Sequence, residues 1–374
     1  MDTATLFGIG SNTKAFTGTL LALLDAEKVM SLDDKVQKWL PTFRLHDPWV
    51  SKESTLRDLV THRLGFETFQ GDFMFFDSDL TKEQVLQKFA LLKPQYSFRS
   101  RWGYTNAAFL AAGEAMAKAT GKTWSTLLQE RLFSPLGMHR TVSSDSAVAK
   151  ATNIARAHTV VNGTLQVIDY GRLDNMAPAG NIYSSAADMS KWLRMLLANG
   201  LADGKTIVPV SALEQTRTPQ SILGNGGHPF NKSHFALYGL GWFLEAYNGR
   251  KIVAHTGGVN GFLTSVALVP EEGLGILVFT NSDTNNFFEA LRWEILDAYL
   301  GLPYRDYSGV QWQQFTASQK MQTDWLKQKR DTIAMKPKTD VPLSALAGQY
   351  QHPVYGWMKI AVKDGKATAT FQHH

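Results

Sequence analysis

The sequence predicts an α/β fold in which helices pack on an antiparallel sheet, with a helix-rich lobe between the first helix and the strands. Residues 11–26 carry apolar side chains on nearly every face, which predicts a central helix packed on all sides. Short segments rich in β-branched and aromatic residues follow one another from residue 238 to residue 280. An amphipathic pattern over residues 285–300 predicts a helix that covers one face of the sheet.

The lobe occupies the middle of the chain, to about residue 215, and we expect it to be mostly helical. Helical patterns alternate there with loops rich in Gly, Pro, Ser and Asp. The helices are expected at residues 107–120, 124–133 and 186–199.

The strands of the sheet are expected at residues 239–244, 251–255, 262–269 and 275–280. Turn sequences at residues 247–249, 259–261 and 270–273 separate them. Connections this short join antiparallel neighbours, so we expect the strands to pair in chain order.

The C-terminal part of the chain predicts one more helix at residues 310–330, a linker at 336–342 and a hairpin built from strands around 357–362 and 367–371. We therefore divide the chain into a main domain of residues 1–300, a helix and linker of residues 301–343, and a short β segment of residues 344–374.

Composition narrows the classes of function. With 44% apolar and 19% charged residues the chain can bury a core, and its net charge of +5 comes from scattered lysines and arginines. Nucleic acid is therefore not an expected partner. The absence of cysteine excludes disulfides, thiolate catalysis and cysteine-bound metals. We expect no signal peptide and no transmembrane segment, because the apolar runs are far shorter than the roughly 20 residues that a bilayer needs.

Ser11 and Lys14 form the chain's only Ser-x-x-Lys sequence. Residues three apart on a helix lie on one face, so the amine is expected beside the hydroxyl. A lysine whose pKa is lowered by desolvation can take the proton of a serine and make it a nucleophile. Taken alone, the motif also fits a serine that caps a helix beside an exposed lysine.

Tyr104 and Asn106 form the only Tyr-x-Asn sequence, just before an apolar helix. A tyrosine facing a lysine can act as a phenolate or pass a proton. The asparagine amide suits either gripping a substrate amide or holding Lys14. The alternative is a buried aromatic residue beside an asparagine that caps the helix.

A third short motif, His255-Thr256-Gly257-Gly258, is expected to end the strand that begins at Lys251. A small residue there lets a substrate lie against the strand edge. The alternative is an ordinary strand end entering a glycine-rich turn.

In this order and at these separations, the three motifs resemble those of the serine β-lactamase and penicillin-binding superfamily. The resemblance is closest to its class C-like branch, with family VIII esterases and D-amino-acid peptidases. Ser11 and Lys14 match its Ser-x-x-Lys motif, Tyr104 and Asn106 its Tyr-x-Asn motif, and residues 255–257 its Lys/His-Thr-Gly motif. Similar stretches lie at residues 59–65, 177–180 and 238–242, and the similarity runs from about residue 6 to residue 300.

The resemblance implies a β-lactamase-like fold and catalysis by Ser11, Lys14 and Tyr104 through an acyl-enzyme. It implies an oxyanion hole made by the backbone N–H groups of Ser11 and Gly258. The substrate-binding residues are expected to be Asn106, His255, Thr256, Gly257 and Gly258. No cofactor or metal is needed, and the family resemblance implies a periplasmic or secreted location.

His255 departs from the family pattern, which usually has a lysine that grips a substrate carboxylate. A histidine is mostly neutral at pH 7, which favours esters and small D-amino-acid amides over β-lactams. We therefore expect a carboxylesterase-like serine hydrolase acting on a small ester, amide or peptide. The alternatives are a D-amino-acid peptidase, a β-lactamase and, from another class, a non-catalytic cell-wall or peptide-binding module. The oligomeric state is left open.

Ten residues precede Ser11, whereas the family commonly has some tens of residues there that supply a helix and two strands. Either the chain is a trimmed form, or its final strands fill the vacant sheet edge. The final segment resembles the beginning of a small β-barrel appended to some family members, cut short. His62 is expected to stabilise its loop by hydrogen bonding.

Overall fold

A computed structural model describes residues 1–224, 228, 230, 233–335 and 340–374. The chain divides into two units, Met1–Thr284 and Asn285–His374. All of the expected site residues lie in the first unit.

Helix α1 (Thr13–Ala26) runs through the interior of the first unit, and every residue from Thr13 to Leu24 is buried. The helix packed on all sides is thus confirmed. A single 3₁₀ turn (Gly10–Asn12) precedes it, so Ser11 lies at the N-terminal end of the helix. The turn therefore holds Ser11, and the first turn of α1 holds Lys14, the other residue of the first motif.

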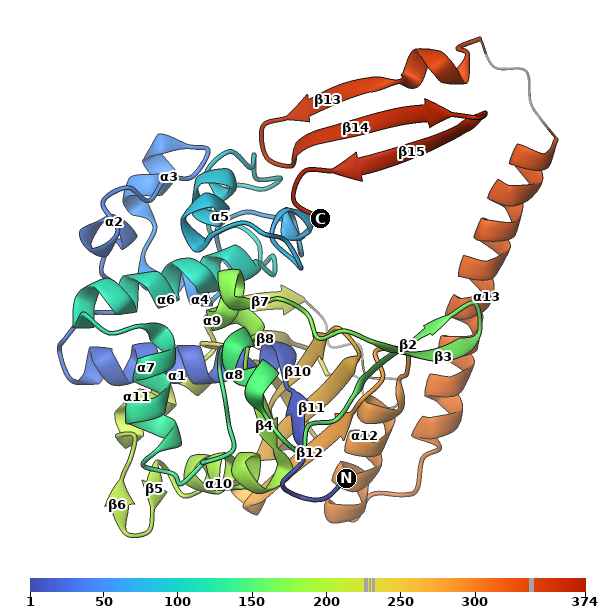
Figure 1. Cartoon of the computed structure of the whole chain (residues 1–374). Coiled ribbons are helices and arrows are strands. Elements are labelled where there is room, and N and C mark those ends of the chain that lie inside the picture. Colours follow the sequence, from blue (N-terminus) through green and yellow to red (C-terminus); the bar gives the residue numbers. More distant parts are fainter. Residues whose placement is uncertain (225–227, 229, 231–232, 336–339) are drawn as a thin grey trace. The chain divides into compact units, whose positions relative to one another are not determined.

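The lobe is mostly helical, as predicted (Figure 1). Its helices are α2 (Val36–Trp39), α3 (Pro48–Glu53), α4 (Leu56–Val60), α5 (Lys82–Phe89), α6 (Asn106–Thr120), α7 (Trp124–Leu128), α8 (Asp145–Lys150), α9 (Ala177–Gly180), α10 (Ala186–Leu197) and α11 (Val210–Arg217). The helix expected at 124–133 is α7 followed by a five-residue π turn, Gln129–Phe133.

The first unit also contains short strands outside the main sheet that were not predicted. The hairpin of β2 (Ala157–Val161) and β3 (Thr164–Ile168) turns at Asn162-Gly163, and β1 (Leu6–Gly8) pairs with β4 (Tyr183–Ser185). A further short pair is β5 (Leu201–Ala202) with β6 (Lys205–Thr206).

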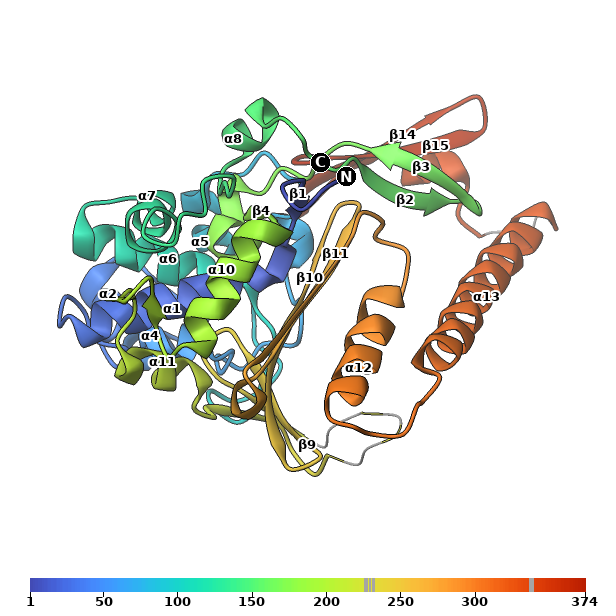
Figure 2. The same cartoon turned by 90° about the horizontal axis from the view of Figure 1, so that it is seen from below.

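The main sheet is antiparallel and has six strands, in the order β12-β11-β10-β9-β8-β7. They are β7 (Ser221–Gly224), β8 (Ala236–Tyr238), β9 (Phe243–Tyr247), β10 (Arg250–Val259), β11 (Phe262–Val269) and β12 (Leu274–Thr280). Pairing in chain order is confirmed. Figure 2 shows helices α1, α10 and α11 on one side of strands β10 and β11.

Two strand predictions need correction. The segment expected as one strand at 239–244 is a turn from Gly239 to Trp242 followed by β9. Gly241 has a φ of +79°, and a β-carbon there would come within 2.3 Å of the Lys14 carbonyl oxygen, so the backbone bends where α1 passes. The strand expected to end at 255 continues to Val259, which places the third motif inside β10.

Strand β9 pairs with β10 only as far as Ala254. Beyond that point β10 still pairs with β11 on one edge, from His255 to Val259. The other edge of this segment is left for the 3₁₀ turn that carries Ser11, whose neighbour Gly10 approaches the backbone of Gly257 and Gly258. The end of the β9 pairing thus leaves this edge of β10 open, and the first and third motifs meet there.

The second unit contains α12 (Phe287–Tyr299), α13 (Tyr307–Ala334) and a sheet of β13 (Gly348–His352), β14 (Gly356–Lys363) and β15 (Lys366–Phe371). Helix α12 packs on α13, where Trp293 stacks on Tyr307 at 6.3 Å and the Tyr307 hydroxyl donates to Asp297 at 2.8 Å. The domain boundary at residue 300 and the packing of the 285–300 helix on the main sheet stay predictions. The linker expected at 336–342 falls in part on residues 336–339, outside the described residues.

Within the second unit the final strands pair with one another. The expectation that they fill a vacant edge of the main sheet stays a prediction. Strands β14 and β15 form the predicted hairpin, and β13 pairs with the other edge of β14 as a third strand of the same sheet. Within the described part of the chain, no helix combines the length and the apolar character needed to cross a membrane.

Candidate active site

The amine of Lys14 lies at the centre of the site, beside the hydroxyl of Ser11. Its Nζ donates hydrogen bonds to Ser11 Oγ at 3.1 Å, to Asn106 Oδ1 at 2.6 Å and to the Ala179 carbonyl at 2.8 Å. The side chain is fully buried. The alternative of a capping serine beside an exposed lysine therefore does not describe this motif.

Burial determines the protonation of Lys14. Desolvation disfavours the charged amine and lowers its pKa to about 7, while the negative charge of Asp72 acts in the opposite direction. A large fraction of Lys14 is thus neutral just above pH 7, which is the form that can accept a proton.

Tyr104 lies in the segment that leads into α6, and its ring is close to Lys14, with Nζ 4.5 Å from the ring centroid. Burial raises the pKa of the phenol above its ordinary value, and the neighbouring Ser11 hydroxyl opposes the rise only partly. The phenol oxygen makes no hydrogen bond of ordinary geometry with the described residues. A neutral phenol close to Ser11 is suited to pass a proton, and less to act as a phenolate.

His62 holds the backbone on both sides of Tyr104. Its Nδ1 accepts the backbone N–H of Thr105 at 3.0 Å, and its carbonyl accepts that of Gly103 at 3.0 Å. Its ring stacks on the Tyr104 ring, with centroids 4.4 Å apart. Burial holds the pKa of His62 well below its ordinary value, so the imidazole stays neutral and can accept this bond. The predicted role of His62 in hydrogen bonding its loop is confirmed.

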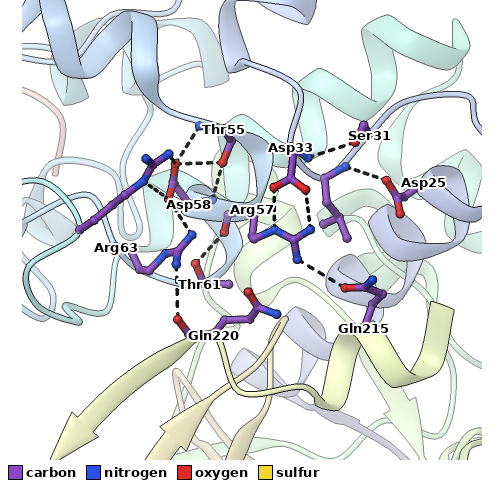
Figure 3. A network of polar contacts seen from close by, with 12 residues as sticks. Asp25, Ser31, Asp33, Thr55, Arg57, Asp58, Thr61, Arg63, Gln215 and Gln220 are labelled. Atoms are coloured by element: carbon purple, nitrogen blue, oxygen red, sulfur yellow. Dashed lines mark hydrogen bonds and ion pairs between the residues drawn. The ribbon is translucent and has the colours of Figure 1, made fainter. Parts of the chain in front are cut away.

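A second brace for the Tyr104 segment is a buried carboxylate, Asp58 (Figure 3). Arg99, five residues before Tyr104, donates to both of its oxygens at 2.9 and 2.6 Å, and Arg63 donates at 2.9 Å. Burial alone would raise the pKa of Asp58, but the hydrogen bonds from Arg99 and Thr55 and the charge of Arg63 bring it below its ordinary value. The loops that carry His62 and Tyr104 are thereby tied to the start of α4.

Asn106, the first residue of α6, has both ends of its amide occupied by the protein. Its Oδ1 accepts from Lys14, and its Nδ2 donates to Asp72 Oδ2 at 2.7 Å. Of the two roles considered for Asn106, the contacts favour holding Lys14 over gripping a substrate.

His255 is buried and neutral. Its Nδ1 bonds to the Thr256 carbonyl at 2.6 Å, and its Nε2 lies 3.1 Å from the hydroxyl of Tyr238, which acts as the donor when Nδ1 carries the proton. Burial and the charge of Lys14 lower its pKa to about 3. It therefore supplies no fixed positive charge for a carboxylate.

Gly257 allows the protein's own backbone to approach. A β-carbon there would lie 1.9 Å from the carbonyl oxygen of Ile9, so only glycine fits. The small residue thus accommodates the turn that carries Ser11, whereas we had expected it to make room for the substrate. At Gly258 a β-carbon would meet only the side chain of Leu263, at 3.3 Å.

A cavity of about 290 Å³ opens over these groups. Six of the eight predicted site residues line it: Ser11, Tyr104, Asn106, His255, Thr256 and Gly258. Lys14 and Gly257 lie behind this surface. Aromatic side chains form much of the remaining wall: Phe69, Phe76, Trp102 and Phe243.

Asp72 lines the same cavity and was missed from the sequence. Its Oδ2 accepts from Asn106, while its buried Oδ1 has no hydrogen-bond partner among the described residues. Burial raises its pKa to about 6, opposed by the Asn106 hydrogen bond and the charge of Lys14, so it is mostly ionised at pH 7. Ala179 was missed too, although residues 177–180 were noted as a similar stretch, because it acts through a backbone carbonyl.

Comparison with known proteins identifies the family. The family model described as "Beta-lactamase" matches residues 1–300. The unguisins hydrolase ungD of Aspergillus violaceofuscus is 26% identical over 418 residues, which cover 99% of this chain and 70% of that protein. The D-alanyl-D-alanine-carboxypeptidase/endopeptidase AmpH of Escherichia coli is 26% identical, over 75% of this chain and 72% of that protein.

Solved structures agree on the fold. The octameric penicillin-binding protein homologue from Pyrococcus abyssi superimposes with a TM-score of 0.66 at 21% identity, over 98% of this chain and 78% of that one. The D-amino acid amidase from Ochrobactrum anthropi SV3, complexed with L-phenylalanine amide, gives a TM-score of 0.60 at 25% identity, over 75% of this chain and 78% of that one.

Proposed function

The chain belongs to the β-lactamase family of hydrolases, and we propose that it cleaves an ester or a small amide through an acyl-enzyme on Ser11. One observation carries the proposal: the buried amine of Lys14 lies 3.1 Å from the Ser11 hydroxyl and contacts two carbonyl oxygens besides. A non-catalytic binding module has no need of a buried lysine, which is costly to desolvate.

The three contacts of Lys14 match the needs of a general base. A neutral amine has two N–H bonds and one lone pair. The carbonyl oxygens of Asn106 and Ala179 accept the two N–H bonds, so the lone pair is left for the hydroxyl of Ser11. Lys14 can then take the proton as Ser11 Oγ bonds to the substrate carbonyl carbon.

The remaining steps use Tyr104 and two backbone N–H groups. The tetrahedral intermediate's oxyanion is stabilised by the backbone N–H groups of Ser11 and Gly258, two residues that line the cavity. Tyr104 passes the proton from Lys14 to the leaving group, whose bond to carbon breaks to give the acyl-enzyme. Water, deprotonated by the same pair, then releases the acid and restores Ser11.

The charge of the cavity favours an uncharged acyl group. His255 is neutral, and the wall is rich in aromatic and aliphatic side chains, so the site suits an apolar ester better than an anionic β-lactam. A carboxylesterase-like activity is therefore the first candidate.

A second candidate is favoured by Asp72. Its carboxylate is part of the cavity lining, carries a negative charge and has an oxygen without a hydrogen-bond partner among the described residues, so it can attract and bind a cationic amine on the substrate. D-amino-acid amides and esters carry such an amine, and the amidase from Ochrobactrum anthropi is among the structural relatives. We keep a D-amino-acid amidase or peptidase as this alternative.

A fluorophosphonate probe tests the assignment. We expect mass spectrometry to locate the label on Ser11 of the parent and to find none on Ser11→Ala. Labelling of another residue, or none in the parent, would refute the proposal. Rates with p-nitrophenyl butyrate, a D-alanyl amide and a chromogenic cephalosporin then separate the substrate classes. The periplasmic or secreted location stays a prediction, which cell fractionation tests.

A further inference from the structure

The carboxylate of Asp72 is joined to the nucleophile by an unbroken series of side-chain hydrogen bonds. Asp72 Oδ2 accepts from Asn106 Nδ2 at 2.7 Å, Asn106 Oδ1 accepts from Lys14 at 2.6 Å, and Lys14 lies 3.1 Å from Ser11 Oγ. All four residues lie in the first unit, and three of them line the cavity.

An asparagine amide presents an acceptor at one end and a donor at the other, and its orientation is set by its partners. Lys14 does not fix that orientation when it is neutral, because its amine can donate as well as accept. An ionised carboxylate only accepts. It therefore holds the NH₂ end of Asn106 and turns the oxygen toward Lys14.

This orientation decides where the lone pair of Lys14 points. With Asn106 Oδ1 and the Ala179 carbonyl both accepting, the two N–H bonds of the neutral amine are used and the lone pair is directed at Ser11. If the Asn106 amide turned over, its NH₂ group would face Lys14 and draw the lone pair away from the nucleophile.

Resting on the proposed role of Ser11, we propose that Asp72 is a positioning residue, which fixes the amide of Asn106 so that the lone pair of Lys14 faces the Ser11 hydroxyl. It acts through Asn106 and without touching the reacting atoms.

Asp72 also sets the charge around Lys14. The other titratable groups that interact with Lys14 are Tyr104, His62 and His255, and burial keeps all three neutral near pH 7. Asp72 is the charged one among the described groups, and its negative charge favours the protonated amine. A change at residue 72 therefore alters two separable quantities, the orientation of Asn106 and the proton affinity of Lys14.

Three variants separate them: Asp72→Asn, Asp72→Ala and, as a matched control, Glu67→Gln. The new asparagine keeps an oxygen that can accept from Asn106 but loses the charge, whereas alanine loses both. The control removes one negative charge from an exposed residue earlier on the same loop. The rate of Ser11 labelling by a fluorophosphonate, measured from pH 5 to pH 9, reports the nucleophile without requiring a known substrate.

For Asp72→Asn we expect the rise of the labelling rate with pH to move at least about 0.5 units lower. Its plateau should lie between those of the parent and Asp72→Ala, because the new amide can accept from Asn106 but can also donate, and so fixes the orientation of Asn106 less firmly than a carboxylate does. For Asp72→Ala we expect the plateau to fall by about tenfold or more, because Asn106 is no longer held. Glu67→Gln should have the same pH midpoint and the same plateau of the labelling rate as the parent. Equal plateaus and equal pH midpoints in all four proteins would overturn the proposal.

Nuclear magnetic resonance of ¹³Cε-labelled lysine gives a second measurement that needs no labelling reaction. The signal of Lys14, assigned by its loss in Lys14→Arg, should titrate at lower pH in Asp72→Asn than in the parent. If the midpoint of the Lys14 titration is unchanged in Asp72→Asn, the effect of Asp72 on Lys14 is refuted. Failure of the probe to label Ser11 is a separate result and would count only against the hydrolase assignment.

Discussion

The imidazole of His62 stacks on the phenol ring of Tyr104, with the two centroids 4.4 Å apart and the planes 29° from parallel. The same histidine accepts the N–H of Thr105, the next residue along the chain. His62 does not line the cavity. Its contribution to catalysis should therefore be made through the position of Tyr104.

We expect His62→Phe to lower kcat by about tenfold or more while KM changes little. Phenylalanine keeps a ring that can stack on Tyr104, but it cannot accept the Thr105 N–H, and a buried donor left unpaired costs about 1–3 kcal/mol. Steady-state kinetics with an uncharged ester measure the effect. His46→Phe, at an exposed histidine, is the control. If His62→Phe unfolds at a lower temperature but keeps a normal kcat, the role of His62 is purely structural.

The pH dependence of activity should follow the protonation of Lys14. Its pKa is lowered to about 7, and the base must be neutral to accept a proton, so kcat/KM rises about tenfold per pH unit below 7 and levels off above. Lys14→Met should abolish this limb and lower kcat/KM by about 10²- to 10⁴-fold. A parent whose activity is flat from pH 5 to pH 8 would exclude Lys14 as the base.

Stability gives an independent check on the same group. Because the folded-state pKa lies below the unfolded one, the unfolded chain binds more protons between about pH 7 and pH 10. The free energy of unfolding therefore gains a contribution that rises with pH in this window and is lost as pH falls through 7. Denaturant titrations should show this rise in the parent and not in Lys14→Met.

Much of the fold could be predicted because its signals are local. Strand β11 has the predicted bounds, and the expected helix at 107–120 differs from α6 by one residue. The β2–β3 hairpin also had a local signal, Asn162-Gly163 between β-branched residues, but the surrounding helical patterns obscured it. The turn from Gly239 to Trp242 depends instead on the passage of α1, which no local pattern contains.

The site divides in the same way. Ser11, Lys14, Tyr104 and Asn106 belong to short motifs whose residue types indicate their chemistry. Asp72 begins a single 3₁₀ turn (Asp72–Met74) with no motif of its own, and only tertiary structure brings it to the Asn106 amide. A backbone carbonyl such as that of Ala179 leaves no mark in the sequence at all.

Asp58 should matter for stability and much less for chemistry. Its side chain is fully buried, while Arg99 and Arg63 are 43% and 23% exposed. Asp58→Ala leaves both guanidinium groups without their carboxylate and removes part of the α4 cap. We therefore expect the free energy of unfolding to fall by about 3 kcal/mol. This is near the low end for deletion of a buried ion-pair partner, because the two arginines can reach water. Chemical denaturation measures it.

The matched control is Asp33→Asn, which removes a 67% exposed carboxylate paired with Arg57 in the same network (Figure 3). For Asp33→Asn we expect the free energy of unfolding to fall by less than about 1 kcal/mol. Since the pKa of Asp58 is lowered by folding, its contribution should be complete above the ordinary pKa near 4 and should vanish as pH falls below it. Equal effects of the two variants would show that Asp58 is not a brace.

Gly257 and Gly258 offer a matched pair for the contact between the first and third motifs. A methyl group at Gly257 would meet the Ile9 carbonyl at 1.9 Å, and backbone cannot give way as a side chain can, so Gly257→Ala should push the Ser11 turn away from β10. We expect a fall of about 10²-fold or more in the rate of Ser11 labelling, because displacement by about 1 Å has this effect on catalysis. Gly258→Ala meets only the flexible Leu263 side chain and keeps its backbone N–H, so labelling should stay within about threefold of the parent. If Ser11 were labelled at the parent rate in both variants, the contact with β10 would not position the nucleophile.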